Sequence, residues 1–246
     1  MVPLTQMAIE VLPSAAAVAE RAASLLAAAL LNPASRPTGL ATGRTMEPVY
    51  AALVPLLQGN PTLARWRSFN LDEYVGLSPQ DPRSFAAFMQ RHLGGPLELA
   101  PGALALPDGR APDADAEALR YGQAVISAGV GLQLLGLGNN GHVGFNEPPC
   151  APSAPCRCLR LSEATRQQNA GAFGGDPEAV PARAITLGLR EILAAEELLL
   201  VVTGGAKSAV LKRLLQEPPG DALPASWLRQ HRSCLVLCDQ AAASGL

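Results

Sequence analysis

The sequence has little charge and no excess of basic side chains. Only 16% of its 246 residues are charged, and the formal net charge is −2. A strongly basic surface is what binds nucleic acid or an anionic membrane, so neither is expected as a partner. An anionic ligand would have to be held by a few local groups rather than by the field of the whole protein.

Long apolar runs, a targeting segment and a cysteine pattern for zinc are also missing. The longest apolar stretch, 15–31, is interrupted by Glu20 and Arg21, so it is too short and too charged to cross a bilayer. The N-terminus lacks the basic segment of a secretory signal. The five cysteines are odd in number and lack zinc spacing, which predicts free thiols in a reducing cytoplasm and no metal site. A redox role for Cys156-x-Cys158 stays open as the alternative.

Strand-like and helix-like segments alternate along the chain, which predicts a doubly wound α/β fold. Nearly half of the residues are apolar, enough for a sizeable core, and 45 prolines and glycines are too few to indicate disorder. We expect a single domain over 1–246. The expected helices are 15–31, 46–57, 83–92, 113–128, 162–173, 185–195, 208–215 and 225–229. The expected strands are 38–41, 66–71, 131–135, 157–161, 197–202 and 234–238.

The most informative stretch runs from 134 to 148 and reads LLGLGNNGHVGFNEP. Glycines let the backbone approach a ligand closely, and His142 titrates near neutrality beside a carboxylate, Glu147, that can set its tautomer and pKa. The spacing Gly136-x-Gly138-x-x-Gly141 matches a dinucleotide fingerprint, but a Glu-Pro sequence follows where that fingerprint needs a helix. A reaction site is the favoured interpretation; a structural turn around a buried histidine is the alternative.

Two connections between a strand and a helix have the form that binds phosphate. Free backbone N–H groups and the helix dipole favour an anion at such a turn. The first turn consists of Thr42, Gly43, Arg44 and Thr45. The second ends in Lys207, a point charge suited to phosphate. A plain helix cap is the alternative for the first turn.

Paired carboxylates and a flexible segment complete the set of candidates. Asp72 and Glu73 follow the strand 66–71, and ligands of open α/β sheets sit outside the carboxyl ends of strands. These carboxylates are candidates for acid–base chemistry, unless one of them only caps or pairs. Prolines and glycines bracket 150–175, which suits a movable lid, or else a mere surface excursion.

Together these strand ends resemble the glucosamine-6-phosphate deaminase (isomerase) family, which is related to 6-phosphogluconolactonase. The resemblance covers nearly the whole chain, and its most specific parts are FNLDEYVGL (69–77) and GHVGFNEP (141–148). It implies a Rossmann-like, mostly parallel sheet with helices on both faces, which works without a nucleotide or other cofactor. The implied reaction converts glucosamine 6-phosphate to fructose 6-phosphate and ammonia.

The resemblance also implies roles for individual residues. His142 would open the sugar ring, Asp72 would move a proton from C2 to C1, and Glu147 would orient His142. Asn140 stands where many members have Asp, so it can bond to His142 but supplies no charge. The substrate and phosphate would be bound by Thr42, Gly43, Arg44, Thr45, Lys207, Gly138 and Gly141.

The lid departs from the family pattern. The family's phosphate-binding arginine belongs in a segment resembling 169–173, which here reads NAGAF. Arg166, Arg183 or Arg44 could replace it. The C-terminus is also short compared with the hexameric members, which predicts a monomer or small homo-oligomer. A galactosamine-6-phosphate deaminase, a lactonase-like hydrolase and a non-catalytic sugar-phosphate sensor are the competing hypotheses.

Overall fold

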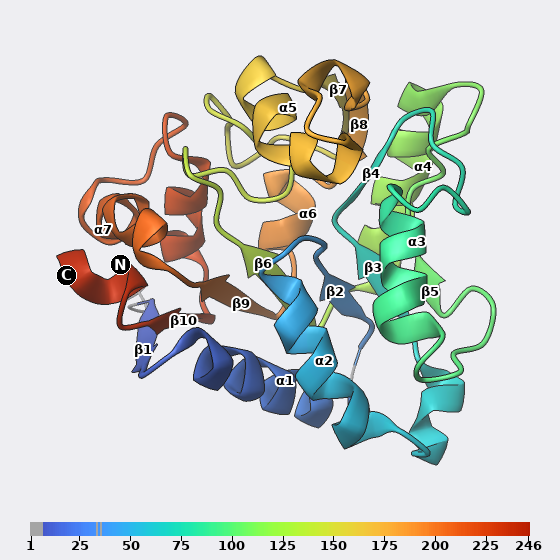
Figure 1. The fold of residues 1–246 in the computed structure, drawn as a ribbon, viewed down its shortest axis with the longest axis horizontal. Coiled ribbons are helices and arrows are strands. Elements are labelled where there is room, and N and C mark those ends of the chain that lie inside the picture. The colour runs from blue at the N-terminus through green and yellow to red at the C-terminus, as the bar shows by residue number, and fades with distance from the viewer. Residues whose placement is uncertain (1–6, 33, 35) are drawn as a thin grey trace.

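A seven-stranded sheet with parallel pairing throughout forms the centre of the protein (Figure 1). The computed structural model describes residues 7–32, 34 and 36–246. The strand order is β1-β10-β9-β6-β2-β3-β5. The strands are β1 (Ala8–Leu12), β2 (Thr38–Leu40), β3 (Ser68–Asn70), β5 (Leu104–Ala105), β6 (Leu132–Gly136), β9 (Glu197–Val202) and β10 (Cys234–Asp239). The helices are α1 (Ala15–Leu31), α2 (Met46–Leu57), α3 (Phe85–Met89), α4 (Ala114–Ala128), α5 (Glu163–Asn169), α6 (Leu189–Leu193) and α7 (Ser208–Gln216).

Helices cover both faces of this sheet, as predicted for a doubly wound fold. The chain moves from β1 through β2 to β3 in one direction and from β6 through β9 to β10 in the other. Because such connections are right-handed, α1 and α2 lie on the face opposite α6 and α7. The strand order reverses between β2 and β6, and that reversal is where a doubly wound sheet opens a crevice for a ligand.

Local sequence determines many of the boundaries. The Ser14 hydroxyl accepts a hydrogen bond from the Ala17 N–H and so caps α1. In β9 every residue after Glu197 is buried, which explains its continuous apolar sequence. The predicted bounds 15–31, 46–57 and 197–202 are confirmed. No helix in the described part of the chain is both long and apolar enough to cross a membrane.

A second, three-stranded antiparallel sheet was not predicted, although the expected strand 157–161 is one of its strands. It contains β4 (Asp72–Tyr74), β8 (Arg183–Thr186) and β7 (Arg157–Arg160), in the order β4-β8-β7. The predicted helix 185–195 is therefore wrong in its first part, because 183–186 pair between two strands and the helix spans only Leu189–Leu193. Strand pairing here overrides local helix propensity. The sequence patterns also gave no indication of β1.

The chain passes from one sheet to the other at Leu71. Its N–H donates to the carbonyl of Leu40, the last residue of β2, and its carbonyl accepts from the N–H of Leu187, just after β8. The expected strand 66–71 thus ends at Asn70, and the residues from Asp72 onward form a strand of their own. Figure 1 shows β7, β8 and α5 gathered together at one end of the molecule.

Candidate active site

A cavity of about 710 Å³ opens where β2 and β6 end, at the reversal of strand order. This volume suits a small-molecule ligand. Eight of the residues predicted from the sequence line it, namely Thr42, Gly43, Arg44, Thr45, Asp72, Gly138, His142 and Lys207. The motifs 69–77 and 141–148, which are far apart along the chain, therefore both contribute residues to a single site.

The turn after β2 forms the positively charged side of the cavity. Gly43 has φ +123°, a conformation that residues with a side chain rarely adopt, and its carbonyl accepts from the Met46 N–H at the start of α2. Lys207 reaches the same side from the turn after β9 and donates to Asn139 Oδ1 at 2.5 Å. Burial lowers the pKa of Lys207, and the charge of Arg44 lowers it further. Two cations and a helix N-terminus thus face one region of the cavity.

The loop after β6 is a tight turn that presents His142. The Gly138 N–H donates to the His142 carbonyl at 2.9 Å, and the Gly141 N–H donates to the Gly138 carbonyl at 3.0 Å. The imidazole lies directly over Gly138, where a Cβ atom would come within 2.2 Å of the ring carbon Cε1. Gly141 has φ +85°, and a Cβ atom there would meet Leu223 at 2.1 Å. These glycines therefore allow the imidazole to occupy its position. The next helix along the chain, α5, begins only at Glu163.

The amide of Asn140 fixes the tautomer of His142. Asn140 Oδ1 lies 2.6 Å from His142 Nδ1, and because this oxygen can only accept, Nδ1 carries the hydrogen and Nε2 keeps its lone pair. Burial lowers the pKa of His142, the charge of Glu147 acts in the opposite direction, and Lys207 lowers the pKa further. The imidazole is therefore a neutral base at pH 7, oriented by an amide rather than by a carboxylate.

Asp72 is a buried carboxyl group that faces the His142 loop. It is 5% exposed, and burial, helped by the charge of Glu73, raises its pKa to about 8. A Cβ atom on Gly144 would lie 3.3 Å from Asp72 Oδ2, so the loop and the carboxyl are in close contact. Thr186, the strand partner of Asp72, accepts the Phe145 N–H and ties the two elements together. A carboxyl group with this raised pKa is a stronger proton acceptor, once ionised, than an ordinary aspartate.

Glu73 has a different task from its neighbour. Its carboxylate accepts hydrogen bonds from the backbone N–H groups of Tyr74, Phe85 and Ala86, at 2.8, 3.0 and 2.8 Å. The last two belong to the first turn of α3, so Glu73 anchors that helix. This is the structural alternative that the sequence left open for one of the two carboxylates.

Glu147 binds the segment that the sequence marked as a lid. Its carboxylate accepts from the Ser162 hydroxyl at 2.6 Å, from the Ser162 N–H at 3.2 Å and from the Thr165 hydroxyl. Both donors belong to the start of α5, which is followed by a 3₁₀ turn at Ala170–Phe173. Glu147 thus acts on His142 through its charge, while Asn140 holds the ring.

The arginines suggested as replacements for the lid arginine lie in different places. Arg44 lines the cavity. Arg166 pairs with Glu178 at 3.0 Å, and Arg183 pairs with Asp115 at 3.4 Å; neither lines the cavity.

Two other arginines do line the cavity, Arg83 and Arg91. Arg83 lies over the Phe173 ring, 5.4 Å from its centroid, and Arg91 lies 6.0 Å from the centroid of Phe88. Sequence reasoning missed both. They reach the site because Glu73 anchors α3 at the edge of the cavity, and that tertiary contact leaves no local sequence signal.

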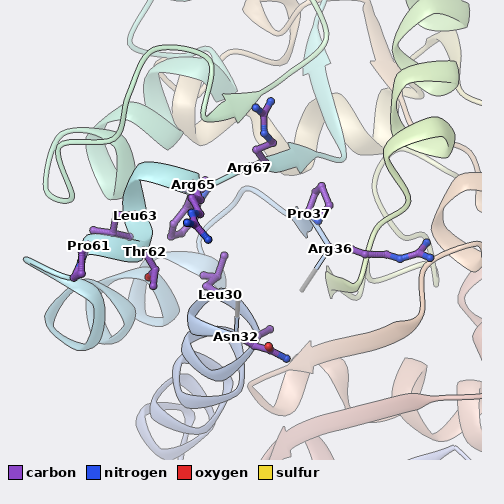
Figure 2. Close-up of a pocket in the computed structure, with 11 residues that line it drawn as sticks. Leu30, Asn32, Arg36, Pro37, Pro61, Thr62, Leu63, Arg65 and Arg67 are labelled. Atoms are coloured by element: carbon purple, nitrogen blue, oxygen red, sulfur yellow. The ribbon is translucent and has the colours of Figure 1, made fainter. Parts of the chain in front are cut away.

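A second cavity, of about 530 Å³, lies at the amino ends of β2 and β3 (Figure 2). Its lining includes Arg36, Arg65 and Arg67, and Figure 2 shows Arg36 extending away from the other two. Arg36 pairs with Glu196 at 3.2 Å. The described residues that line this cavity include no carboxylate, histidine or cysteine, so it lacks the groups for acid–base catalysis.

Comparison with known proteins identifies the family of this chain. The model of the family described as glucosamine-6-phosphate isomerases/6-phosphogluconolactonase matches residues 13–237. The chain belongs to this family. A glucosamine-6-phosphate deaminase from Geobacillus sp. (strain WCH70) is 39% identical over 229 residues, which are 92% of this chain and 91% of the relative. One from Beutenbergia cavernae is 38% identical over 242 residues, 98% of this chain and 93% of the relative.

Solved structures of the family show the same fold. A protein described as a monomeric glucosamine-6-phosphate deaminase has a TM-score of 0.93 at 35% identity, over 98% of this chain and 100% of that one. A 6-phosphogluconolactonase from Leishmania guyanensis has a TM-score of 0.75 at 21% identity, over 98% of each chain. The second likeness shows the common fold alone. The glycine turn around His142 does not lead directly into a helix, unlike the arrangement that a dinucleotide fingerprint requires.

Proposed function

We propose that this protein is a glucosamine-6-phosphate deaminase that converts glucosamine 6-phosphate and water to fructose 6-phosphate and ammonia. The observation that carries the proposal is one cavity holding a buried carboxyl group, Asp72, a neutral imidazole, His142, and a cationic turn. Aldose–ketose isomerisation needs one base that reaches two adjacent carbons, and ring opening needs a second group with a pKa near or below neutrality. The identity of 38–39% to curated deaminases supports the same substrate.

Ring opening is the step assigned to His142. Nε2 has its lone pair available, because Asn140 holds the hydrogen on Nδ1. It takes the proton from the O1 hydroxyl and delivers a proton to the ring oxygen O5 as the C1–O5 bond breaks. Glu147 stabilises the imidazolium that exists between the two transfers, since its charge raises the pKa of His142.

Proton transfer between carbons is the step assigned to Asp72. The ionised carboxylate removes the proton from C2 of the open-chain aldehyde and returns it to C1. In the same conversion the substrate ammonium loses one proton and O1 gains one, so that C2 carries a protonated imine and C1 a hydroxymethyl group. Water then adds to the imine, and ammonia departs to leave the ketone. The ammonium group of the bound substrate favours ionisation of Asp72, because an opposite charge nearby lowers the pKa of a buried carboxyl.

The phosphate end of the substrate is assigned to the turn of residues 42–45 together with Lys207. Backbone N–H groups at the start of α2 and two cations suit a dianionic phosphate. We further propose that the protein acts in the cytoplasm as a monomer or small homo-oligomer; the neighbour with a TM-score of 0.93 is described as monomeric. No cofactor is assigned to the cavity.

Ammonia release tests the proposal directly. The purified protein is expected to release ammonia from glucosamine 6-phosphate with a kcat/KM at least tenfold above that for galactosamine 6-phosphate, the competing substrate. A 6-phosphogluconolactone arm tests the hydrolase alternative, which needs no C2 base. Release from neither amino sugar would refute the proposal, and preference for the galactosamine epimer would transfer it to that substrate.

A further inference from the structure

The lid segment is joined to the catalytic loop by a single carboxylate. Glu147 belongs to the loop of His142, while its partners Ser162 and Thr165 belong to the first turn of α5. Three donors on one carboxylate are enough to fix its position, because hydrogen bonds to a charged acceptor are stronger than neutral ones. Ser162 is also the N-cap of α5, since its hydroxyl accepts the Thr165 N–H at 3.1 Å.

The same segment forms one wall of the cavity. Five residues of α5 and the turn that follows it line the cavity: Thr165, Gln168, Asn169, Gly171 and Ala172. At the far end of this wall, Phe173 packs edge-on against Tyr74, with ring centroids 5.5 Å apart. The wall is therefore attached at two points, to Glu147 at its start and to an aromatic cluster at its end.

The two attachments differ in whether they involve a charged group. The aromatic contact is apolar and depends on packing alone. The Glu147 contact joins the lid to a charge that acts on His142. Movement of α5 away from the cavity removes the donors of Glu147, and so changes the surroundings of the catalytic imidazole at the same time as it opens the site.

We propose that Ser162 and Thr165 are positioning residues, which close α5 over the cavity by hydrogen-bonding to Glu147. Closure of the lid and placement of Glu147 beside His142 then occur together. The catalytic consequence depends on the proposed function, but the contact and its effect on lid opening do not. Amide exchange of 163–173 measures lid opening without reference to any substrate.

A matched pair of substitutions at Ser162 provides the test. Ser162→Asn and Ser162→Asp both keep an N-cap acceptor, and Asp is the better match to the helix dipole. If Ser162 only caps the helix, Ser162→Asp exchanges more slowly than Ser162→Asn. The proposal predicts the opposite, because Asp faces the Glu147 carboxylate across a contact that is now 2.6 Å. We expect exchange of 163–173 at least tenfold faster in Ser162→Asp than in Ser162→Asn, and a KM at least tenfold higher.

The Glu147→Gln background separates the contact from other effects. There the order is expected to reverse, so that Ser162→Asp exchanges no faster than Ser162→Asn, because the Gln amide can donate to the new carboxylate and the helix dipole again favours Asp. Thr165→Val is expected to speed exchange and raise KM, and Thr165→Ser, which keeps the hydroxyl, to restore both. Gln167→Ala, on the exposed side of α5, is the control.

Two outcomes overturn the proposal. One is slower or equal exchange in Ser162→Asp relative to Ser162→Asn. The other is a difference between them that persists unchanged in the Glu147→Gln background. Absence of deaminase activity would refute the proposed function without affecting the exchange measurements, so the two failures are distinguishable.

Discussion

The two sides of the catalytic cavity are built from different sheets and carry different kinds of charge. The parallel-sheet side consists of residues 42–45 and Lys207, in turns that follow β2 and β9, and it presents cations. The small-sheet side consists of Asp72 on β4 and the wall formed by α5 and Ala170–Phe173, and it presents a buried acid and a cover. His142 lies on the loop between them, held by Asn140.

We propose that this difference separates substrate binding from the chemical step. A phosphate needs fixed cations and backbone N–H groups, which turns at strand ends supply at little conformational cost. A carbon base needs a carboxyl group removed from water, which costs stability and requires a surrounding structure that enforces burial. Damage to the parallel-sheet side should therefore raise KM, and damage to the small-sheet side should lower kcat.

The largest effect is expected from Asp72→Asn. Removing the C2 base should lower kcat on the order of 10³-fold in the ammonia assay, within the range for general-base catalysis. The same change should stabilise the protein. The folded pKa of about 8 exceeds the usual 3.8, so the folded state retains a proton that the unfolded chain releases, and wild-type stability falls as pH rises through this interval.

Thermal denaturation at pH 5 and pH 8 checks the predicted stabilisation by Asp72→Asn. The melting temperature of Asp72→Asn should exceed that of the wild type by more at pH 8 than at pH 5. Glu73→Gln is the matched control, and it should be destabilised instead, because the amide nitrogen of Gln cannot accept one of the backbone N–H groups that the carboxylate holds at the start of α3. Equal melting temperatures for Asp72→Asn and wild type at pH 8 would contradict a buried, destabilising carboxyl.

On the parallel-sheet side, Lys207→Met should raise KM for glucosamine 6-phosphate by about 10- to 100-fold and leave kcat nearly unchanged. A charge-assisted hydrogen bond to the phosphate is worth about 1.5–3 kcal/mol, and it is made equally in ground and transition states. Lys212→Met, an exposed lysine on α7 away from the cavity, is the control. A loss confined to kcat would show that Lys207 serves the chemistry, and would remove the division between the two sides.

The pH profile tests whether Asp72 or His142 sets the active range. Because Asp72 titrates at about 8 and burial keeps the pKa of His142 low, kcat/KM should fall about tenfold per unit below pH 8, as one proton is bound. Asn140→Asp places a carboxylate beside His142 Nδ1, which raises the pKa of His142. Protonation of both Asp72 and His142 should then lower kcat/KM, so the fall with decreasing pH should become steeper than tenfold per unit. The profiles are corrected for titration of the substrate amine. An unchanged limb in Asn140→Asp would show that His142 is insensitive to its Nδ1 partner.

The parallel-sheet side was predictable from the sequence, and the small-sheet side only in part. Apolar strands that end in glycine turns follow local rules, so the bounds of β9 and α2 and the turn at 42–45 could be predicted. Of the small sheet, only β7 was predicted as a strand, at 157–161. The strands β4 and β8 carry polar and charged residues such as Arg183, and their pairing joins segments that are far apart in the chain. Arg83 and Arg91 were missed for the same reason, since tertiary contacts such as the Glu73 anchor bring α3 to the cavity. Sequence patterns are least predictive for a strand whose residues line a functional site rather than pack in the hydrophobic core.

The smallest expected effect is a lower KM, from a substitution in the wall formed by α5 and Ala170–Phe173. Gly171 lines the cavity from the wall formed by α5 and Ala170–Phe173, and a Cβ atom there would meet no atom within 4 Å. It lies in the segment where the family resemblance places a phosphate-binding arginine. Gly171→Arg should therefore fit without strain and lower KM by about two- to tenfold, because part of the charge attraction is offset by the entropy of a long side chain. Ala164→Arg, which adds the same charge to the exposed part of α5, is the control. Equal KM values for the two variants would mean that a side chain at position 171 does not reach the phosphate. Arg44, Arg83 and Arg91, which line the cavity from other elements, would then be the candidates for the charge that the lid arginine supplies in the family.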